Sequence, residues 1–521
     1  MLPAVVAAGV ALLPVAYLVV RAAEAGWPAV TEILVRDRTV ALVVRSVALA
    51  AAVTVTALVI GLPLAWLTTR TDLPGRRGWG VVAALPLAVP SFVAAYAWVS
   101  VLPQVSGFLG TWLVLSFSTY PYVYLPVAAA LRGTDPALEE VARSLGRGAL
   151  RTSVSVTARM ARPAATAGAL LVALYALSDF GTPSLMRYDV FTRAIHTSYT
   201  ASFDRTPAAV LSLVLVGLTV AITVGETRAR GRAEYAPLGT GATRVAQPVR
   251  LGRATPLAVV GAALVAAVAL GYPSGVLTHW VSQGRSAGVD WASLGPAGLS
   301  TVWVALLGAA AATALAVPVG ILAARHPDRG GRLLEHLTFA GHAVPGIVVA
   351  LALVFLGVRY AQPIYQETPL LVVAYAVLFM PAVVGSVRAA VSQSPRRLEE
   401  VARSLGRTPA GVLRHVTLPL AAPGVAAGFA LVTLTAMKEL PATLLLRPTG
   451  MDTLATRLWT HTGVGEYAAA APYAVTLVLL AAVPTVVLSR VQARPSRERS
   501  PRPAATAATT AAPRVAAEVT T

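Results

Sequence analysis

Twelve long apolar stretches constrain this chain more than any other feature. Each approaches the length of about 20 residues that an α-helix needs to cross the hydrocarbon core of a bilayer. They lie near residues 4–20, 40–66, 78–101, 108–131, 164–178, 207–225, 256–271, 301–324, 337–358, 369–387, 421–436 and 470–489. Because lipid offers no hydrogen-bond partners to the backbone, such stretches predict membrane-spanning helices. We expect the first to be a retained helix, since no basic segment precedes it as in a signal peptide.

The overall composition supports a membrane protein. Apolar residues make up 56% of the 521 residues, charged residues only 12%, and the mean hydropathy is +0.69. A soluble domain carries about 25% charged residues, so most of this surface must face lipid. The chain has no Cys, which excludes disulfides and thiolate metal sites.

The basic residues indicate the orientation in the membrane. Among the 42 basic residues, 30 fall in segments that a cytoplasmic N-terminus places inside, and 11 fall outside. This bias is typical of a multi-pass protein of the bacterial cytoplasmic membrane. No long basic segment with interleaved aromatic residues occurs, so the lipid bilayer is an expected partner and nucleic acid is not.

A ten-residue segment shows that the chain is duplicated. The sequence LEEVARSLGR at 138–147 recurs without change at 398–407, an offset of 260 residues. Each half has six spans, an even number, so the halves cross the bilayer in the same direction. The predicted fold is therefore an all-α membrane protein with about 12 transmembrane helices in two parallel six-helix repeats. We expect a first membrane domain at 1–225, a cytoplasmic linker at 226–253, a second domain at 254–490 and a disordered cytoplasmic tail at 491–521.

The repeated segment has the pattern of a short amphipathic helix. One face is apolar in the first copy, and it is formed by Leu138, Val141, Ala142 and Leu145; the opposite face holds Glu139, Glu140, Arg143 and Ser144. A helix this short is unstable in water, so it must dock on something. It can dock on the ends of its own spans or on a partner, and two unchanged copies favour one partner surface presented twice.

The repeated segment and its surroundings resemble the cytoplasmic loop of ABC importer permeases. That loop has the pattern Glu-Ala-Ala, a Gly four residues on, and then Ile-x-Leu-Pro. The second copy has Glu400-Val401-Ala402, Gly406 and Val416-Thr417-Leu418-Pro419, whereas the first copy lacks the final Leu-Pro.

The resemblance implies a type I importer fold, with coupling loops at 132–163 and 388–423. Each loop would sit in a groove of one of two ATPase subunits, and an extracytoplasmic binding protein would deliver the substrate. The expected coupling residues are Glu139, Glu140, Ala142, Leu145 and Gly146 in the first loop, and Glu399, Glu400, Ala402, Leu405 and Gly406 in the second. The two glycines are expected to end the helices in a left-handed conformation.

Two longer stretches narrow the resemblance to one branch. Residues 178–183 and 437–448, with 452–455, resemble the fused two-domain permeases of ferric-iron importers. Permeases for thiamine, phosphonate, polyamines or sulfate remain alternatives. Asp179 and Glu439 occupy equivalent positions near the outer ends of the fifth and eleventh spans. Oxygen ligands suit a hard trivalent cation, so both are candidates for the substrate path; the alternative is that they cap helices or pair with Lys438.

The chain has no pattern for a nucleotide site of its own. Such a site needs a Gly-rich loop whose Lys precedes Ser or Thr, and the only lysine stands in Met437-Lys438-Glu439. We therefore expect no catalytic residues, resident metal or cofactor in this chain, with ATP and Mg²⁺ used by the partner ATPase.

The rival interpretation is a secondary transporter of the major facilitator type, which also has two six-span halves. The loops at 72–77 and 328–332 resemble its Asp-Arg-x-Gly-Arg loop, but the span cores lack the Asp or Glu that proton coupling usually needs. A membrane enzyme is disfavoured because the seven His show no ligand spacing.

Overall fold

The computed structural model describes residues 1–133, 137–146, 148, 152–201, 205–230, 248–284, 290–326, 328–340 and 344–493. Within these residues every regular element is helical, and a single isolated β-bridge joins Thr71 to Val249. The all-α fold expected from the apolar stretches is confirmed.

The first half of the chain holds six of the predicted spans, the first copy of the repeated segment and several short helices. Its helices are α1 (Leu2–Glu24), α2 (Trp27–Val35), α3 (Asp37–Arg70), α4 (Arg76–Ala84), η1 (Leu85–Ala88), α5 (Ser91–Val101), η2 (Pro103–Val105), α6 (Phe108–Thr119), α7 (Pro121–Gly133), α8 (Ala137–Ser144), η3 (Ser153–Thr157), α10 (Ala158–Ser178), α11 (Gly181–Leu185), α12 (Phe191–Ala201) and α13 (Thr206–Arg230).

The second half repeats this order with small differences. Its helices are η4 (Gly252–Ala254), α14 (Thr255–Ala266), η5 (Ala267–Gly271), α15 (Tyr272–Gly284), α16 (Trp291–Arg325), α17 (Arg329–Ala340), α18 (Gly346–Tyr360), η7 (Gln362–Ile364), α19 (Thr368–Gln393), α20 (Arg396–Ser404), α21 (Pro409–Val412), η8 (Leu413–Thr417), α22 (Leu418–Met437), α23 (Pro441–Leu446), α24 (Leu454–Gly463) and α25 (Tyr467–Ala493).

Each of the twelve predicted stretches falls on apolar helix, but two of them are not continuous. In the described residues nine helices are long and apolar enough to cross a membrane, or ten if the pair Arg76–Ala88 and Ser91–Val101 counts as one span. That pair bends by 85°, and the ninth stretch is divided between α17 and α18. The predicted spans at 78–101 and 337–358 are therefore each interrupted, which the apolar pattern did not reveal. Pro90 and Pro345 directly precede α5 and α18, and a proline cannot continue the hydrogen-bonded ladder.

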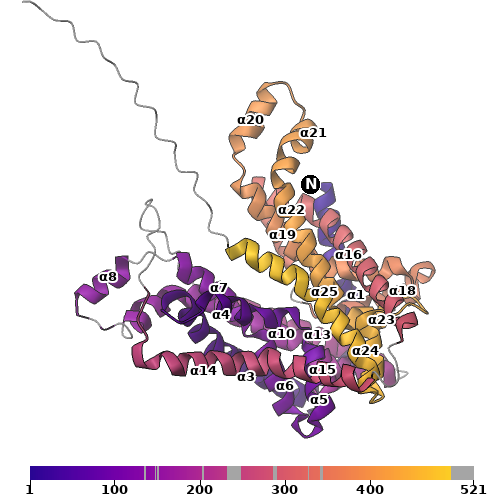
Figure 1. Cartoon of the computed structure of the whole chain (residues 1–521). Coiled ribbons are helices and arrows are strands. Elements are labelled where there is room, and N and C mark those ends of the chain that lie inside the picture. Colours follow the sequence, from indigo (N-terminus) through magenta and orange to yellow (C-terminus); the bar gives the residue numbers. More distant parts are fainter. Residues whose placement is uncertain are drawn as a thin grey trace, which may run out of the picture.

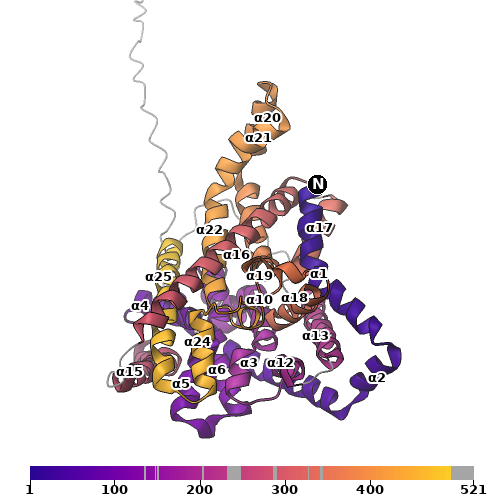
Figure 2. The ribbon, with the colours of Figure 1, turned by 90° about the vertical axis from the view of Figure 1, so that its right-hand side faces the viewer.

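The first span of each half packs against helices of the other half. Helix α1 contacts α16, α17 and α18, whereas the segment from α14 to α15 contacts α3, α4 and α5 (Figures 1 and 2). Ala7 and Ala11 of α1 lie in one buried cluster with Ala309 and Ala312 of α16. Small side chains allow close approach, which holds helices together where lipid removes the hydrophobic driving force. The two sequence halves are thus interlocked in space.

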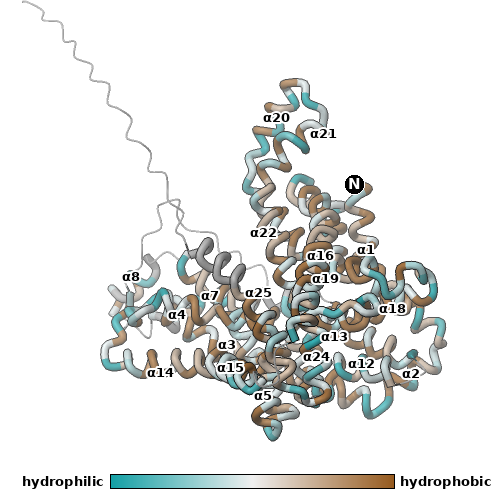
Figure 3. The backbone as a smooth tube through the Cα atoms, turned by 45° about the vertical axis from the view of Figure 1, so that its right-hand side comes forward, coloured by the Kyte–Doolittle hydropathy of each residue, from teal (hydrophilic) through white to brown (hydrophobic). Residues whose placement is uncertain are grey.

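Helices α20 and α21 project beyond the bundle of spans at the end where α1 begins (Figure 1). The spans are coloured mainly as hydrophobic, whereas α20 and α21 alternate between hydrophilic and hydrophobic residues (Figure 3). This end of the molecule therefore belongs outside the apolar layer, as the arginine distribution predicts for the cytoplasmic side.

Candidate coupling helices and cavity between the halves

The two copies of the repeated segment form the short helices α8 and α20. The large apolar side chains on and just after these helices face away from the rest of the chain: Val401 is 54% exposed, Leu405 78% and Leu145 76%. Large apolar side chains held outward on a short projecting helix mark an interaction surface. In the described residues these large side chains do not pack on the ends of their own spans.

One polar residue of each copy is buried, which corrects the sequence interpretation. Glu139 and Glu399 were expected on the exposed polar face, yet they are only 5% and 6% exposed. Glu399 Oε1 lies 2.8 Å from Arg325 Nη2 and 2.9 Å from Arg325 Nε. Glu139 Oε1 lies 3.5 Å from Arg70 Nη2. An arginine at the inner end of a span thus neutralises each buried carboxylate, and periodicity within the loop does not reveal it.

A threonine completes each of these contacts. Thr157 donates to Glu139 over 2.9 Å and Thr417 donates to Glu399 over 3.0 Å. Both threonines end the π-helical turns η3 and η8, which lead directly into the next span. We call each Arg–Glu–Thr set a clamp: Arg70, Glu139 and Thr157 in the first half, and Arg325, Glu399 and Thr417 in the second. Each clamp ties one copy of the repeated helix to the span before it and the span after it.

The remaining predicted coupling residues differ in their exposure to solvent. Glu140 and Glu400 are exposed, Ala142 is buried and Ala402 is half-buried. Gly146 and Gly406, two residues after the ends of the helices, have φ angles of +81° and +80°, the left-handed conformation expected of them. Residues 134–136, 147 and 149–151 of the first predicted loop lie outside the described residues.

A cavity of about 240 Å³ lies between the two halves, and both predicted substrate-path carboxylates line it. Asp179 follows α10 and Glu439 follows α22, so the structure brings the two equivalent positions together. Ser91 at the start of α5 and Gly346 at the start of α18 line the same cavity. The helix breaks within 78–101 and 337–358 therefore lie at the same cavity as the two carboxylates.

Both carboxylates cap short helices, which was the alternative interpretation. Asp179 accepts hydrogen bonds from the Ser91 hydroxyl (2.8 Å) and the Thr182 amide (3.2 Å). Glu439 accepts from the amides of Ala442 (2.9 Å) and Thr443 (3.0 Å). No group of three or more His, Asp or Glu residues that could hold a metal ion occurs in the described residues.

Lys438 also lines the cavity, but it does not pair with the neighbouring acids. Its ammonium group donates over 2.9 Å to the carbonyl oxygen of Leu87, which belongs to the other half of the chain. Of the two alternatives for the carboxylates, capping is therefore observed and pairing with Lys438 is not, since the Leu87 carbonyl beside the helix break is the partner of Lys438.

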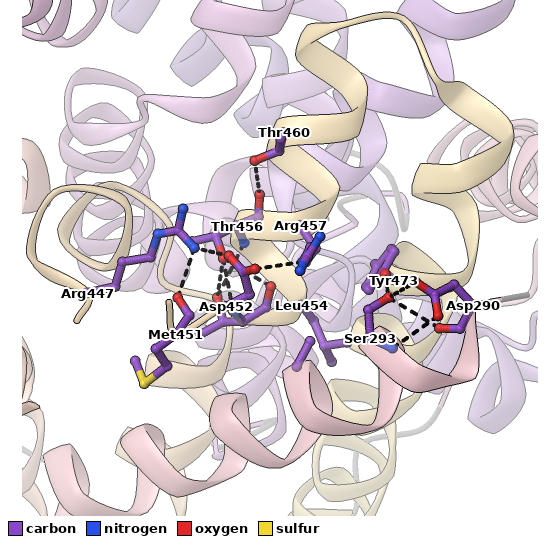
Figure 4. A network of polar contacts seen from close by, with 12 residues as sticks. Asp290, Ser293, Arg447, Met451, Asp452, Leu454, Thr456, Arg457, Thr460 and Tyr473 are labelled. Atoms are coloured by element: carbon purple, nitrogen blue, oxygen red, sulfur yellow. Dashed lines mark hydrogen bonds and ion pairs between the residues drawn. The ribbon is translucent and has the colours of Figure 1, made fainter. Parts of the chain in front are cut away.

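A polar network holds the segment that follows the second carboxylate (Figure 4). Asp452 forms ion pairs with Arg447 and with Arg457 (2.7 Å), and Arg447 donates to the Met451 carbonyl over 2.8 Å. This network joins the end of α23 to α24, so the helix that Glu439 caps is fixed at both ends.

Sequence reasoning missed the arginines of the clamps and the helix breaks. A second match between the two halves, at an offset other than 260 residues, could have indicated both the arginines and the breaks. Arg70 precedes Arg325 by 255 residues, and Val89-Pro90 precedes Val344-Pro345 by the same distance. The offset differs from 260 because the segments between them differ in length.

Comparison with known proteins gives two matches along the chain to one family, the binding-protein-dependent transport system inner membrane components, at residues 57–225 and 316–499. The Fe(3+)-transport system permease protein FbpB 2 of Haemophilus influenzae is 36% identical over 483 residues, which cover 92% of this chain and 95% of that protein.

Two further relatives match a smaller part of the chain. The sulfate transport system permease protein CysT of Escherichia coli is 29% identical over 33% of this chain and 67% of its own length. A putative 2-aminoethylphosphonate transport system permease protein, PhnV of Salmonella typhimurium, is 29% identical over 43% of this chain and 82% of its own.

Proposed function

We propose that this chain transports ferric iron. It belongs to the family of binding-protein-dependent transport system inner membrane components. The chain is a permease subunit of an ABC importer and a multi-pass protein of the cytoplasmic membrane. The observation that carries the ferric assignment is the 36% identity to a Fe(3+) permease over nearly the whole of both chains.

The energy for transport is assigned to a partner. The chain's single lysine lies beside the cavity and not in a nucleotide-binding loop, so ATP and Mg²⁺ belong to a separate ATPase, present in two copies. The exposed apolar side chains of α8 and α20 offer one equivalent docking surface in each half. Glu140 and Glu400 stand exposed beside them and supply acceptors for donors in the ATPase grooves.

The clamps give the docked helices a mechanical connection to the spans. When ATP draws the two ATPase subunits together, α8 and α20 move with them. Because Glu139 and Glu399 are buried against Arg70 and Arg325, α3 and α16 follow the movement. The threonines carry it to α10 and α22, which end at the cavity.

The cavity serves as the substrate path in an alternating-access cycle. ATP-driven closure must favour one state by about 5.5 kcal/mol to move a 1:99 population to 99:1. An extracytoplasmic binding protein delivers the substrate to the outer side. The expected division of the chain into two membrane domains at 1–225 and 254–490, joined by a cytoplasmic linker and followed by a disordered tail, forms part of this proposal.

Uptake into proteoliposomes tests the substrate. The chain is reconstituted with its ATPase and binding protein, and accumulation of radiolabelled ferric iron, sulfate, thiamine and a polyamine is measured with ATP inside. We expect accumulation of iron alone. ATP-dependent accumulation of another substrate without iron would refute the ferric assignment and leave the importer class intact.

A further inference from the structure

The two carboxylates that line the cavity already accept hydrogen bonds from the protein itself. Both oxygens of Asp179 accept bonds, from Ser91 and Thr182. Both oxygens of Glu439 accept as well, and one of them accepts from both the amide and the hydroxyl of Thr443. A bare trivalent cation would have to compete with these donors for its oxygen ligands. The carboxylates are therefore partly engaged as helix caps and are not held free for such a cation.

The groups in the cavity without partners can all donate hydrogen bonds. An ammonium group has three hydrogen-bond donors, and the described residues occupy one of those of Lys438, at the Leu87 carbonyl. The hydroxyls of Ser118, Tyr122 and Ser178 line the same cavity and have no hydrogen-bond partner in the part of the chain that the structure describes. Donors without partners face a space that is far larger than one water molecule needs.

Two helix N-termini add positive potential to these donors. The 11-residue helix α5 starts at Ser91 and the 15-residue helix α18 starts at Gly346, and both residues line the cavity. A helix N-terminus carries roughly half a positive charge and leaves its first amide groups without partners in the helix. Together with Lys438, the two ends offset the charges of Asp179 and Glu439, so the cavity does not present the strong negative field that a naked ferric ion requires.

We propose that this cavity binds the oxyanion ligand of the substrate, so that the ferric ion crosses as a complex with an anionic oxygen ligand. Lys438, the free hydroxyls and the starts of α5 and α18 hold the anion's oxygens. The proposal rests on the ferric function proposed above and deepens it. By their names, two of the relatives carry sulfate and 2-aminoethylphosphonate, both oxygen-rich anions, which fits a site of this chemistry in the family.

The sign of the effect of Lys438→Gln tests this proposal. An anion site loses a charge-assisted hydrogen bond, so uptake of radiolabelled ferric iron by the reconstituted importer should fall about tenfold or more. Lys438→Arg keeps the charge and should retain most of the uptake. Arg359→Gln removes a positive charge from an exposed side chain and should leave uptake unchanged. A site for the bare cation predicts the opposite, because removal of a neighbouring positive charge would keep or raise iron uptake.

Direct binding to the unmodified importer keeps the test independent of the variants' folding. The purified permease–ATPase complex in nanodiscs is titrated with radiolabelled inorganic phosphate and, separately, with terbium(III) as a bare trivalent probe. We expect saturable phosphate binding that ferric citrate displaces. For terbium we expect no saturable binding at the two carboxylates, so that Asp179→Asn and Glu439→Gln leave the terbium titration unchanged. Iron uptake that is undiminished in Lys438→Gln, with no phosphate binding, would overturn the anion site but leave ferric import standing. Failure of the unmodified importer to take up iron would instead refute the proposed function.

Discussion

Replacing Glu399 by Gln should release α20 from its span. The change keeps the side chain's size and an oxygen for Thr417, but it leaves Arg325 buried without its counter-charge. Loss of one partner of a buried ion pair costs about 3–5 kcal/mol. Arg325 also lies 3.3 Å from the Ser394 carbonyl, so we expect the lower end, about 3 kcal/mol. That is roughly a 100-fold rise in the population with α20 detached.

Hydrogen exchange at the amides of α20 measures this population. Protection at Arg396–Ser404 should fall by about two orders of magnitude in Glu399→Gln. The matched control is Glu400→Gln, the same change one residue on, at an exposed carboxylate that forms no ion pair among the described residues. It should leave the exchange unchanged. In the first half the Arg70–Glu139 contact is longer, 3.5 Å, so Glu139→Gln should have a smaller effect at α8.

The same variant should uncouple the importer. In Glu399→Gln the ATPase should still bind but drive less uptake for each ATP hydrolysed, because the moving helix no longer pulls α16. Replacing both partners with apolar residues, as in Arg325→Met with Glu399→Leu, removes the stranded charge and should restore much of the protection without restoring the coupling. Unchanged α20 exchange and unchanged coupling in Glu399→Gln would refute the role given to the clamps.

Three further predictions concern the coupling surface, the cavity and the bundle. Gly406→Asp strains the left-handed backbone by about 1–2 kcal/mol but should leave the chain in the membrane, since a Cβ there meets nothing within 4 Å; it should abolish co-purification of the ATPase, and normal co-purification would count against the surface. Asp179→Ala combined with Glu439→Ala removes two helix caps at about 1 kcal/mol each and should lower uptake of ferric iron, whereas a normal rate would show that transport needs neither carboxylate. Ala312→Leu should lower thermal stability by about 1–3 kcal/mol through overpacking of α1 on α16, while Val5→Leu on the exposed face of α1 should not, and equal melting temperatures would contradict the interlocked packing.

Local patterns in the sequence were sufficient for the helices and for the repeat. The apolar stretches predict twelve membrane segments because a lipid-exposed helix needs a long apolar run whatever it packs against. The glycines at 146 and 406 predict helix ends because their left-handed conformation depends on the residue itself. The presence of Asp179 and Glu439 in one cavity agrees with the duplication, which predicts that equivalent positions of the two halves have equivalent roles.

Contacts between distant segments could not be predicted in this way. The burial of Glu139 depends on an arginine 69 residues earlier, and a helical periodicity contains no information about that residue. The partner of Lys438 is a backbone carbonyl 351 residues away, which only the meeting of the two halves brings close. The sequence shows Pro90 and Pro345 as possible helix breaks. It does not show that the starts of α5 and α18, which follow these prolines, line one cavity together.

The energy source of transport tests the central claim most directly. The chain is reconstituted alone into proteoliposomes, and then with its ATPase and binding protein, and uptake of radiolabelled ferric iron is measured with ATP inside or with an imposed proton gradient. Uptake should occur only with the ATPase and ATP present. Iron accumulation by the chain alone under the proton gradient would contradict the account and identify a secondary transporter.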